Sequence, residues 1–179
     1  MNEPQDPVDG DAPGKDPAGI VLPSKRFEGR EEFRQLVRDA LACAARDGWR
    51  EIVLSDATFE DWPLGERGVA ESLQAWSAAG RRMVLLARTY DGVVRQHARF
   101  VQWRGTWSHI VTASACPGAD ALELPSALWS PRWVMERRDV EHCLGYAGSE
   151  PERRVAVREL LDGWLRKATP AFPATTLGL

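Results

Sequence analysis

The sequence has few of the residues that mark metal centres, secretion or membrane insertion. Its three cysteines (Cys43, Cys116 and Cys143) are widely spaced, with no CxxC or Cys/His ligand pattern, so we expect no structural zinc site. No run approaches the roughly 18 apolar residues that cross a membrane, and the acidic, proline-rich start is unlike a secretory signal. GxGxxG, Walker, HExxH and GxSxG motifs are absent. These absences predict a cytoplasmic protein without cofactor or metal and without a membrane partner.

Lysine is also scarce, and the charge is unevenly spread. Arginine supplies 20 of the 23 basic residues, which is typical of a GC-rich genome and also favours bidentate anion contacts. Residues 1–19 carry five acids and one lysine, whereas the remainder is close to neutral. This segment has four prolines and almost nothing apolar, so we predict a disordered tail over 1–19 and a single domain over 20–179. The near-neutral body argues against nucleic acid as a partner.

A repeated unit of helix, glycine and strand predicts the fold class. Apolar residues recur at helical spacing over 30–46, Gly48 follows, and EIVLSD reads as a strand buried on both faces. The second copy has a helix over 66–79, Gly80 as its cap, and the strand RMVLLA. About 31 residues separate the two strand starts, which is typical of a parallel βαβ crossover. We therefore predict an α/β domain with a mixed, mostly parallel sheet flanked by helices.

The other expected elements do not follow this repeated unit. GIVLPS is expected to form a short edge strand, VVRQHARFVQWRG a third helix, and WSHIVTAS a strand. LPSALWSPRWVMER reads as an antiparallel hairpin, and RDVEHCLGYAG is ambiguous. A capping box at Ser149 predicts the start of the last helix, after which TPAFPATTLGL is expected to pack onto the body.

Candidate ligand-binding residues follow the predicted strands, because ligands of parallel α/β sheets bind beyond the carboxyl ends of strands. Ser and Asp at these positions also cap helices and form turns, so both readings stay open. His109, in a predicted strand, is either a functional group or a core residue. The candidates are Ser55, Asp56, Trp62, Arg88, Tyr90 and His109.

Tryptophan is abundant, with eight residues of which Trp103, Trp107, Trp129 and Trp133 cluster between 100 and 135. Such a cluster forms a stacking platform, a packed core or a dimer seam. We expect a homodimer in which LPSALWSPRW supplies the seam.

The order of features from Phe33 to Ala87, with EIVLSDATFEDW, VAESLQAW and GRRMVLLA in turn, resembles the first part of a phospholipase D-like domain. The resemblance extends through WSHIVTAS and ELLDGWLRKATPAF and is to a bacterial group that lacks the catalytic signature. Catalytic members carry H-x-K-x4-D. Here His109 is followed by Val111 and Cys116 at the Lys and Asp positions, so the resemblance implies no catalytic residue.

Two functions remain open at this stage. The first is a non-catalytic binding or interaction module on a degenerate phospholipase D-like scaffold, with a small anionic ligand or a protein as its partner. The second is a phosphodiesterase or other hydrolase with an altered site around His109. The surroundings of the His109 imidazole distinguish them, because catalysis needs an open cleft with an acid or base within hydrogen-bond reach.

Overall fold

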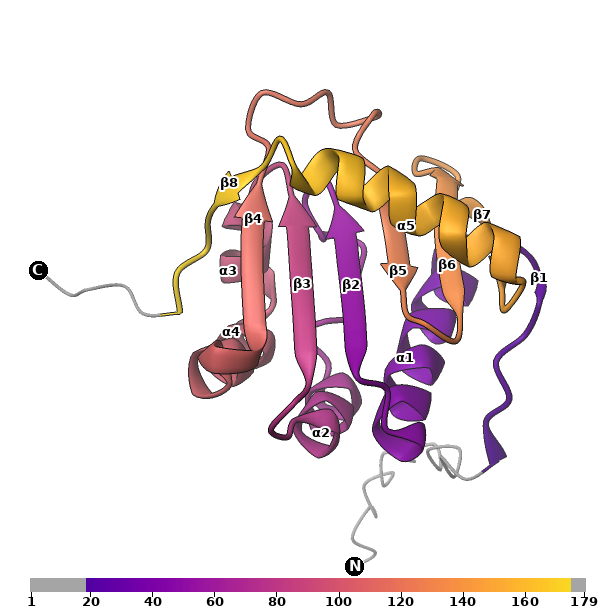
Figure 1. The fold of residues 1–179 in the computed structure, drawn as a ribbon, viewed down its shortest axis with the longest axis horizontal. Coiled ribbons are helices and arrows are strands. Elements are labelled where there is room, and N and C mark those ends of the chain that lie inside the picture. The colour runs from indigo at the N-terminus through magenta and orange to yellow at the C-terminus, as the bar shows by residue number, and fades with distance from the viewer. Residues whose placement is uncertain (1–18, 175–179) are drawn as a thin grey trace, which may run out of the picture.

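The computed structural model describes residues 19–174, which form one open sheet with helices on both faces (Figure 1). The tail predicted over 1–19 falls outside the described residues except for Gly19, and so does the end of the 169–179 segment. The strands of the described chain are β1 (Lys25–Glu28), β2 (Glu51–Asp56), β3 (Arg82–Ala87), β4 (Val111–Ala115), β5 (Ser126–Trp129), β6 (Val134–Asp139), β7 (Leu144–Gly148) and β8 (Thr169–Pro170). The α-helices are α1 (Arg30–Asp47), α2 (Arg67–Trp76), α3 (Asp91–Gln96), α4 (Ala98–Thr106) and α5 (Pro151–Leu165).

The sheet has the strand order β1-β7-β6-β5-β2-β3-β4-β8. Only β2–β3 and β3–β4 are parallel, and the other neighbours are antiparallel. The prediction of a mostly parallel sheet is therefore wrong. Helical crossovers join β2 to β3 and β3 to β4, whereas short turns join β5, β6 and β7, and short turns produce antiparallel neighbours.

The helices divide into two unequal layers. Helices α1 to α4 cover one face of the sheet, and α5 alone runs across the other (Figure 1). Side chains along β2 point alternately to the two faces of the sheet. Ile52 and Leu54 pack in the larger core beneath α1, whereas Val53 packs in the smaller core beneath α5. The three-residue apolar run in β2 thus fits a strand covered on both faces.

Several predicted elements agree with the structure, and the first crossover agrees best. Helix α1 ends at Gly48, which has φ 66° and ψ 46° and caps the helix in the left-handed conformation. The predicted second crossover helix is shorter than expected, since α2 ends at Trp76 with Ser77 as its cap. The hairpin predicted around Ser130 is present as β5 and β6.

Three local predictions are wrong. GIVLPS is not a strand, because the edge strand β1 begins after it at Lys25. The predicted third helix is two helices that break at His97, where φ is −119° and ψ is 53°. His97 is buried at this break, and its Nε2 lies 2.8 Å from the Phe59 carbonyl oxygen. Ser149 does not cap α5: Glu150 is the cap residue and Pro151 begins the helix, a position where a missing N–H costs nothing.

No helix among residues 19–174 is long and apolar enough to cross a membrane. The same residues hold no group of three His, Cys, Asp or Glu side chains that could bind a metal ion.

Candidate functional site

The carboxyl end of β2, where a ligand site was predicted, holds a buried polar cluster centred on Asp56. One carboxylate oxygen of Asp56 accepts hydrogen bonds from the backbone N–H groups of Thr58 (3.1 Å) and Phe59 (2.8 Å). The other accepts from the Ser126 hydroxyl at 2.6 Å and from the Arg137 guanidinium at 2.8 Å. Both oxygens are therefore occupied by the protein itself. The contacts with Thr58 and Phe59 fit the turn-forming reading of Asp56, whereas those with Ser126 and Arg137 join it to β5 and β6.

Arg137, on β6, completes this cluster and was not singled out by the sequence analysis. Its side chain is only 1% exposed. The guanidinium donates to Ser126 Oγ at 3.0 Å and to Asp61 at 3.0 Å, and it stacks 4.2 Å above the Phe33 ring. Burial alone would lower the pKa of Arg137, but the combined charge and hydrogen-bond contacts with Asp56 and Cys143 outweigh it, so the pKa is raised. Arg137 is thus held as a buried cation.

The cluster reaches the surface through one further ion pair. Asp61 is partly exposed and also contacts Arg30 of α1, at 3.0 Å. The chain of contacts from Asp56 through Arg137 and Asp61 to Arg30 alternates in sign, so each buried charge has an opposite neighbour. Such pairing offsets the cost of removing charges from water. The arrangement ties α1, β2, β5 and β6 together and leaves no free nucleophile or general acid.

The other predicted residues at this end are also used in packing. The Ser55 hydroxyl donates to the Pro125 carbonyl oxygen at 2.6 Å. Trp62 is fully buried between Phe33 and Phe59. The Tyr90 hydroxyl donates to the Ser114 carbonyl oxygen at 2.8 Å, and burial raises the pKa of this phenol well above its usual range.

Arg88 and His109 are the exposed members of the candidate set, and they lie at opposite ends of the sheet. Arg88 follows β3, whereas His109 precedes β4. His109 belongs to a short 3₁₀ helix over Ser108–Ile110, so its predicted position in a strand is wrong. Its ring lies 5.7 Å from that of Trp107, and it makes no hydrogen bond within residues 19–174. The structure does not bring His109 together with the other candidates.

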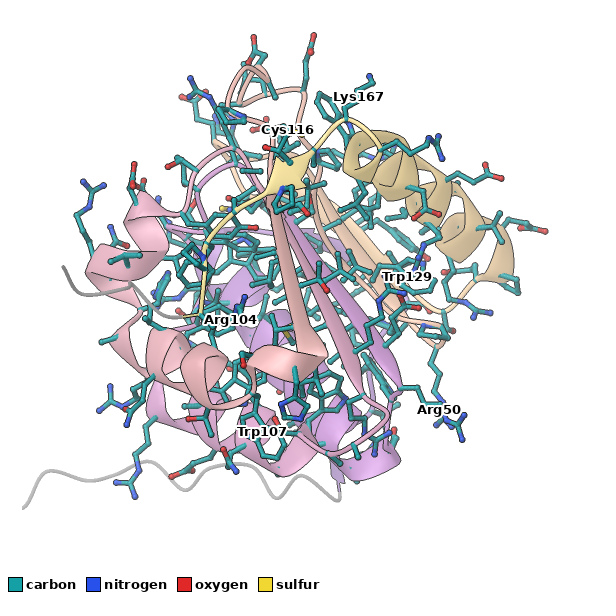
Figure 2. The ribbon with its side chains drawn as sticks, turned by 60° about the vertical axis from the view of Figure 1, so that its left-hand side comes forward. Arg50, Arg104, Trp107, Cys116, Trp129 and Lys167 are labelled. Carbon is teal, nitrogen blue, oxygen red and sulfur yellow. The ribbon has the colours of Figure 1, made fainter. Side chains whose placement is uncertain are left out.

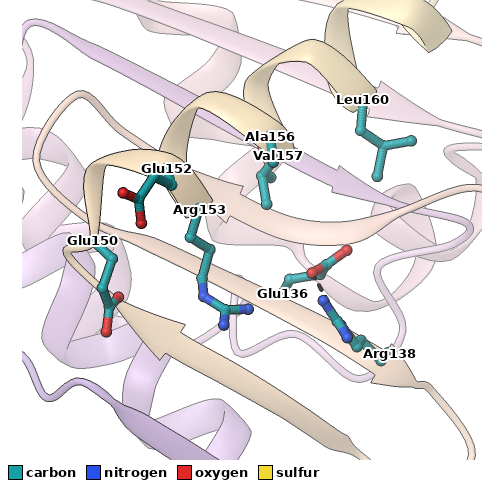
Figure 3. Close-up of a pocket in the computed structure, with 8 residues that line it drawn as sticks. All are labelled: Glu136, Arg138, Glu150, Glu152, Arg153, Ala156, Val157 and Leu160. Atoms are coloured by element: carbon teal, nitrogen blue, oxygen red, sulfur yellow. Dashed lines mark hydrogen bonds and ion pairs between the residues drawn. The ribbon is translucent and has the colours of Figure 1, made fainter.

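A shallow pocket of about 450 Å³ lies between α5 and the sheet (Figure 3). Its lining mixes charges of both signs, with Glu136 and Arg138 paired at 3.3 Å and Arg153 stacked 3.7 Å above the Tyr146 ring. Leu160 adds an exposed apolar side chain. The lining therefore presents charges of both signs, with one ion pair between Glu136 and Arg138 and with Arg153 held by the Tyr146 ring.

The segment predicted as a dimer seam is instead part of the fold. Leu128 is fully buried, while Trp129 and Trp133 are 9% and 2% exposed. β5 lies between β2 and β6 in the sheet. LPSALWSPRW therefore cannot supply the predicted seam.

Arginines gather at the amino ends of β2 and β3, the lower edge in Figure 1. Figure 2 shows Arg50 extending outward from the body of the protein. The Arg82 N–H donates to the Arg50 carbonyl oxygen at 2.9 Å, so these two residues are neighbours. We call the following residues the arginine edge: Arg50, Arg82, Arg132, Arg154 and Arg158.

Contacts through β5 join the remaining members. Arg158 lies 4.7 Å above the Trp129 ring, and the Trp129 indole N–H donates to the Arg154 carbonyl oxygen at 2.8 Å. The Arg154 guanidinium in turn donates to the carbonyl oxygen of Pro131, the residue before Arg132. The arginine edge is thus a continuous surface drawn from β2, β3, the β5–β6 turn and α5.

Few carboxylates balance this surface. Glu51 lies 3.1 Å from Arg158 and 4.0 Å from Arg82, and Asp162 lies 2.9 Å from Arg158. The exposed side chains of Arg50 and Arg132 make no hydrogen bond or ion pair within the described residues. The arginine edge therefore has an excess of positive charge and guanidinium groups with unused donors.

No family model and no curated relative matches the sequence. Solved structures do share the fold. The archaeal chromatin protein TrmBL2, whose structure shows a novel mode of DNA binding, aligns with a TM-score of 0.59 at 14% identity over 83% of this chain and 54% of that chain. NucT from Helicobacter pylori, a phospholipase D-family protein, aligns with a TM-score of 0.56 at 8% identity over 83% of this chain and 99% of that chain.

The likeness to NucT supports a phospholipase D-like fold for this open α/β sheet flanked by helices. The chain spans about half the length of TrmBL2. The expectation that nucleic acid is not a partner is overturned, because a structure with the same fold belongs to a DNA-binding chromatin protein. The physical reason given for that expectation, a near-neutral body, does not hold locally, since the arginine edge concentrates positive charge.

Proposed function

We propose that this chain is a non-catalytic module on a phospholipase D-like scaffold that binds the nucleic-acid backbone through the arginine edge. The observation that carries the proposal is the excess of guanidinium groups at that edge, with the side chains of Arg50 and Arg132 unpaired within residues 19–174. Guanidinium groups donate in a fork that matches phosphate oxygens. Each neutralised phosphate releases counterions, which supplies most of the free energy of non-specific binding. The DNA binding of TrmBL2, a protein of the same fold, is consistent with this role.

The non-catalytic part of the proposal rests on the polar groups at the carboxyl ends of the strands. Asp56, Ser126 and Arg137 satisfy one another beneath α1. No histidine in the sequence is followed two residues later by lysine. The surroundings of His109, exposed and without an acid or base in hydrogen-bond reach among the described residues, do not favour the alternative of a hydrolase.

The test is binding of a fluorescently labelled 20-base-pair DNA duplex measured by anisotropy at several salt concentrations. We expect a dissociation constant of about 10⁻⁴–10⁻⁶ M that rises steeply with salt. Neutralising the three most exposed members of the edge, in the variant R50Q/R82Q/R132Q, should make the slope of log K against log salt shallower. The slope should change by up to about 0.9 for each phosphate that the variant no longer neutralises.

A matched control removes the same charge from other surfaces. The variant R88Q/R95Q/R166Q changes three exposed arginines that lie beyond the carboxyl ends of β3 and α5 or on α3. It should keep the slope of the native protein. No binding at 50 mM salt, or an equal reduction of the slope in both triple variants, would overturn the proposal. Cleavage of the DNA in the same samples would overturn its non-catalytic part.

A further inference from the structure

The described chain begins beside the arginine edge. The Arg46 guanidinium of α1 donates to the Ile20 carbonyl oxygen at 2.7 Å, which fixes the start of the described chain at the carboxyl end of α1. The indole N–H of Trp133, the residue after Arg132, donates to the Pro23 carbonyl oxygen at 2.9 Å. Residues 1–18 are therefore attached next to one member of the edge.

The sequence that precedes this point is complementary in charge. Residues 1–18 carry a single base, Lys15, against five acids, Glu3, Asp6, Asp9, Asp11 and Asp16. The arginine edge and its acidic partners hold five guanidinium groups against the carboxylates of Glu51 and Asp162. An excess of negative charge is thus covalently attached beside an excess of positive charge.

Segment 1–18 is also long enough to cover the edge. Eighteen residues span at most about 60 Å when extended. Neighbouring strands lie about 4.8 Å apart, so the four strands from β3 to β6 extend over only about 15 Å. The segment holds few apolar residues, so charge is the main attraction that it offers.

We propose that the acidic segment 1–18 docks on the arginine edge and competes there with nucleic acid. The competition rests on the proposed function, whereas the docking does not. Each carboxylate that occupies a guanidinium takes a contact that a phosphate would use. If the segment covers the edge nine-tenths of the time, apparent DNA affinity falls about tenfold, because only the uncovered fraction is competent to bind.

Docking is tested directly on the full chain with a nitroxide spin label at position 12, introduced by Ala12→Cys. The native cysteines are buried, so the label should attach selectively to the new thiol. At 20 mM salt we expect paramagnetic broadening of the backbone amide signals of Arg50, Arg82 and Arg132. The broadening should vanish at 500 mM salt, where the Debye length is a few ångströms, and in R50Q/R82Q/R132Q.

Competition is tested with the variant E3Q/D6N/D9N/D11N/D16N in the same DNA anisotropy assay. We expect about five- to tenfold tighter DNA binding at 50 mM salt. A control for total charge neutralises five exposed glutamates on other surfaces and should change the affinity less than twofold; these are Glu60, Glu71, Glu123, Glu141 and Glu152.

The outcomes separate the two proposals. Broadening confined to the edge together with tighter binding by the acid-neutralised variant supports both. Broadening at the edge without DNA binding by any variant supports docking and overturns the proposed function. Broadening spread over the surface or absent overturns docking, whatever the DNA does. Docking with equal DNA affinity in the acid-neutralised and control variants overturns the competition.

Discussion

Replacing Arg137 tests whether the cluster beneath α1 holds the fold together. Arg137→Met keeps much of the side-chain volume but removes the cation that faces Asp56 at 2.8 Å. Three donors to Asp56 remain, from Ser126, Thr58 and Phe59. The carboxylate is nevertheless left buried without its ion partner, a change that typically costs about 3–5 kcal/mol.

This loss is large compared with the total free energy of unfolding. The free energy of unfolding of such domains is about 5–15 kcal/mol, so Arg137→Met should remove about a fifth or more of it. In urea, with a slope of about 2 kcal/mol per molar, the unfolding midpoint should fall by about 1.5–2.5 M. Tryptophan fluorescence reports the transition, since the chain has eight tryptophans, several of them in the core.

A second variant shows whether an uncompensated charge is the cause. Asp56→Asn/Arg137→Met leaves no buried ion, and removing both partners of a buried pair typically costs much less than removing one. The double variant should therefore be more stable than Arg137→Met alone. A single variant that is destabilised by less than about 1 kcal/mol, or a double variant whose destabilisation equals the sum of the two single values, would refute this reasoning.

Four further outcomes are expected. Gly145→Ala should lower stability by about 1–3 kcal/mol in the same urea assay, because its added methyl group would collide with the Glu136 carbonyl oxygen. The hydrogen bond to Asp139 raises the pKa of His142. The stabilisation from this pair is therefore complete below pH 6.5 and is lost as pH rises through the raised pKa. Asp139→Asn should lower the pKa of His142 measured by NMR titration. Generic phosphodiesters should not be hydrolysed, and turnover that disappears in His109→Ala would revive the hydrolase alternative. A homodimer stays a prediction that light scattering checks, and a monomer at high concentration would remove it.

The first crossover was predictable because its signals are local. The helix over Arg30–Asp47 needs only apolar residues at helical spacing and a glycine at its end, and both are contiguous in the chain. The β5–β6 hairpin has the same advantage. The break at His97 has no such local signal, and the contact that His97 makes there is with Phe59, 38 residues away.

The candidate site shows the same limit more sharply. Asp56 was predicted as a ligand-binding residue because it lies at the carboxyl end of β2. In the structure its carboxylate contacts Arg137, which is 81 residues later in the chain. Without that partner, a conspicuous aspartate at a strand end reads equally well as a ligand site or a turn. Arg137 makes Asp56 part of a buried network of hydrogen bonds and charges, which the pattern of strand ends alone does not reveal.

Net charge does not describe local charge, for a related reason. A phosphate near the surface responds to charges within about one Debye length, roughly 8–10 Å at moderate salt, and not to the sum over the chain. Arg50, Arg82 and Arg132 lie in three separate segments whose own neighbours include Glu51 and Asp47, so no window of sequence reveals their grouping. Folding brings them to one edge while acids such as Glu123 and Glu141 lie in other loops. A body with almost no net charge can therefore carry a locally positive surface, and that surface follows from the strand order.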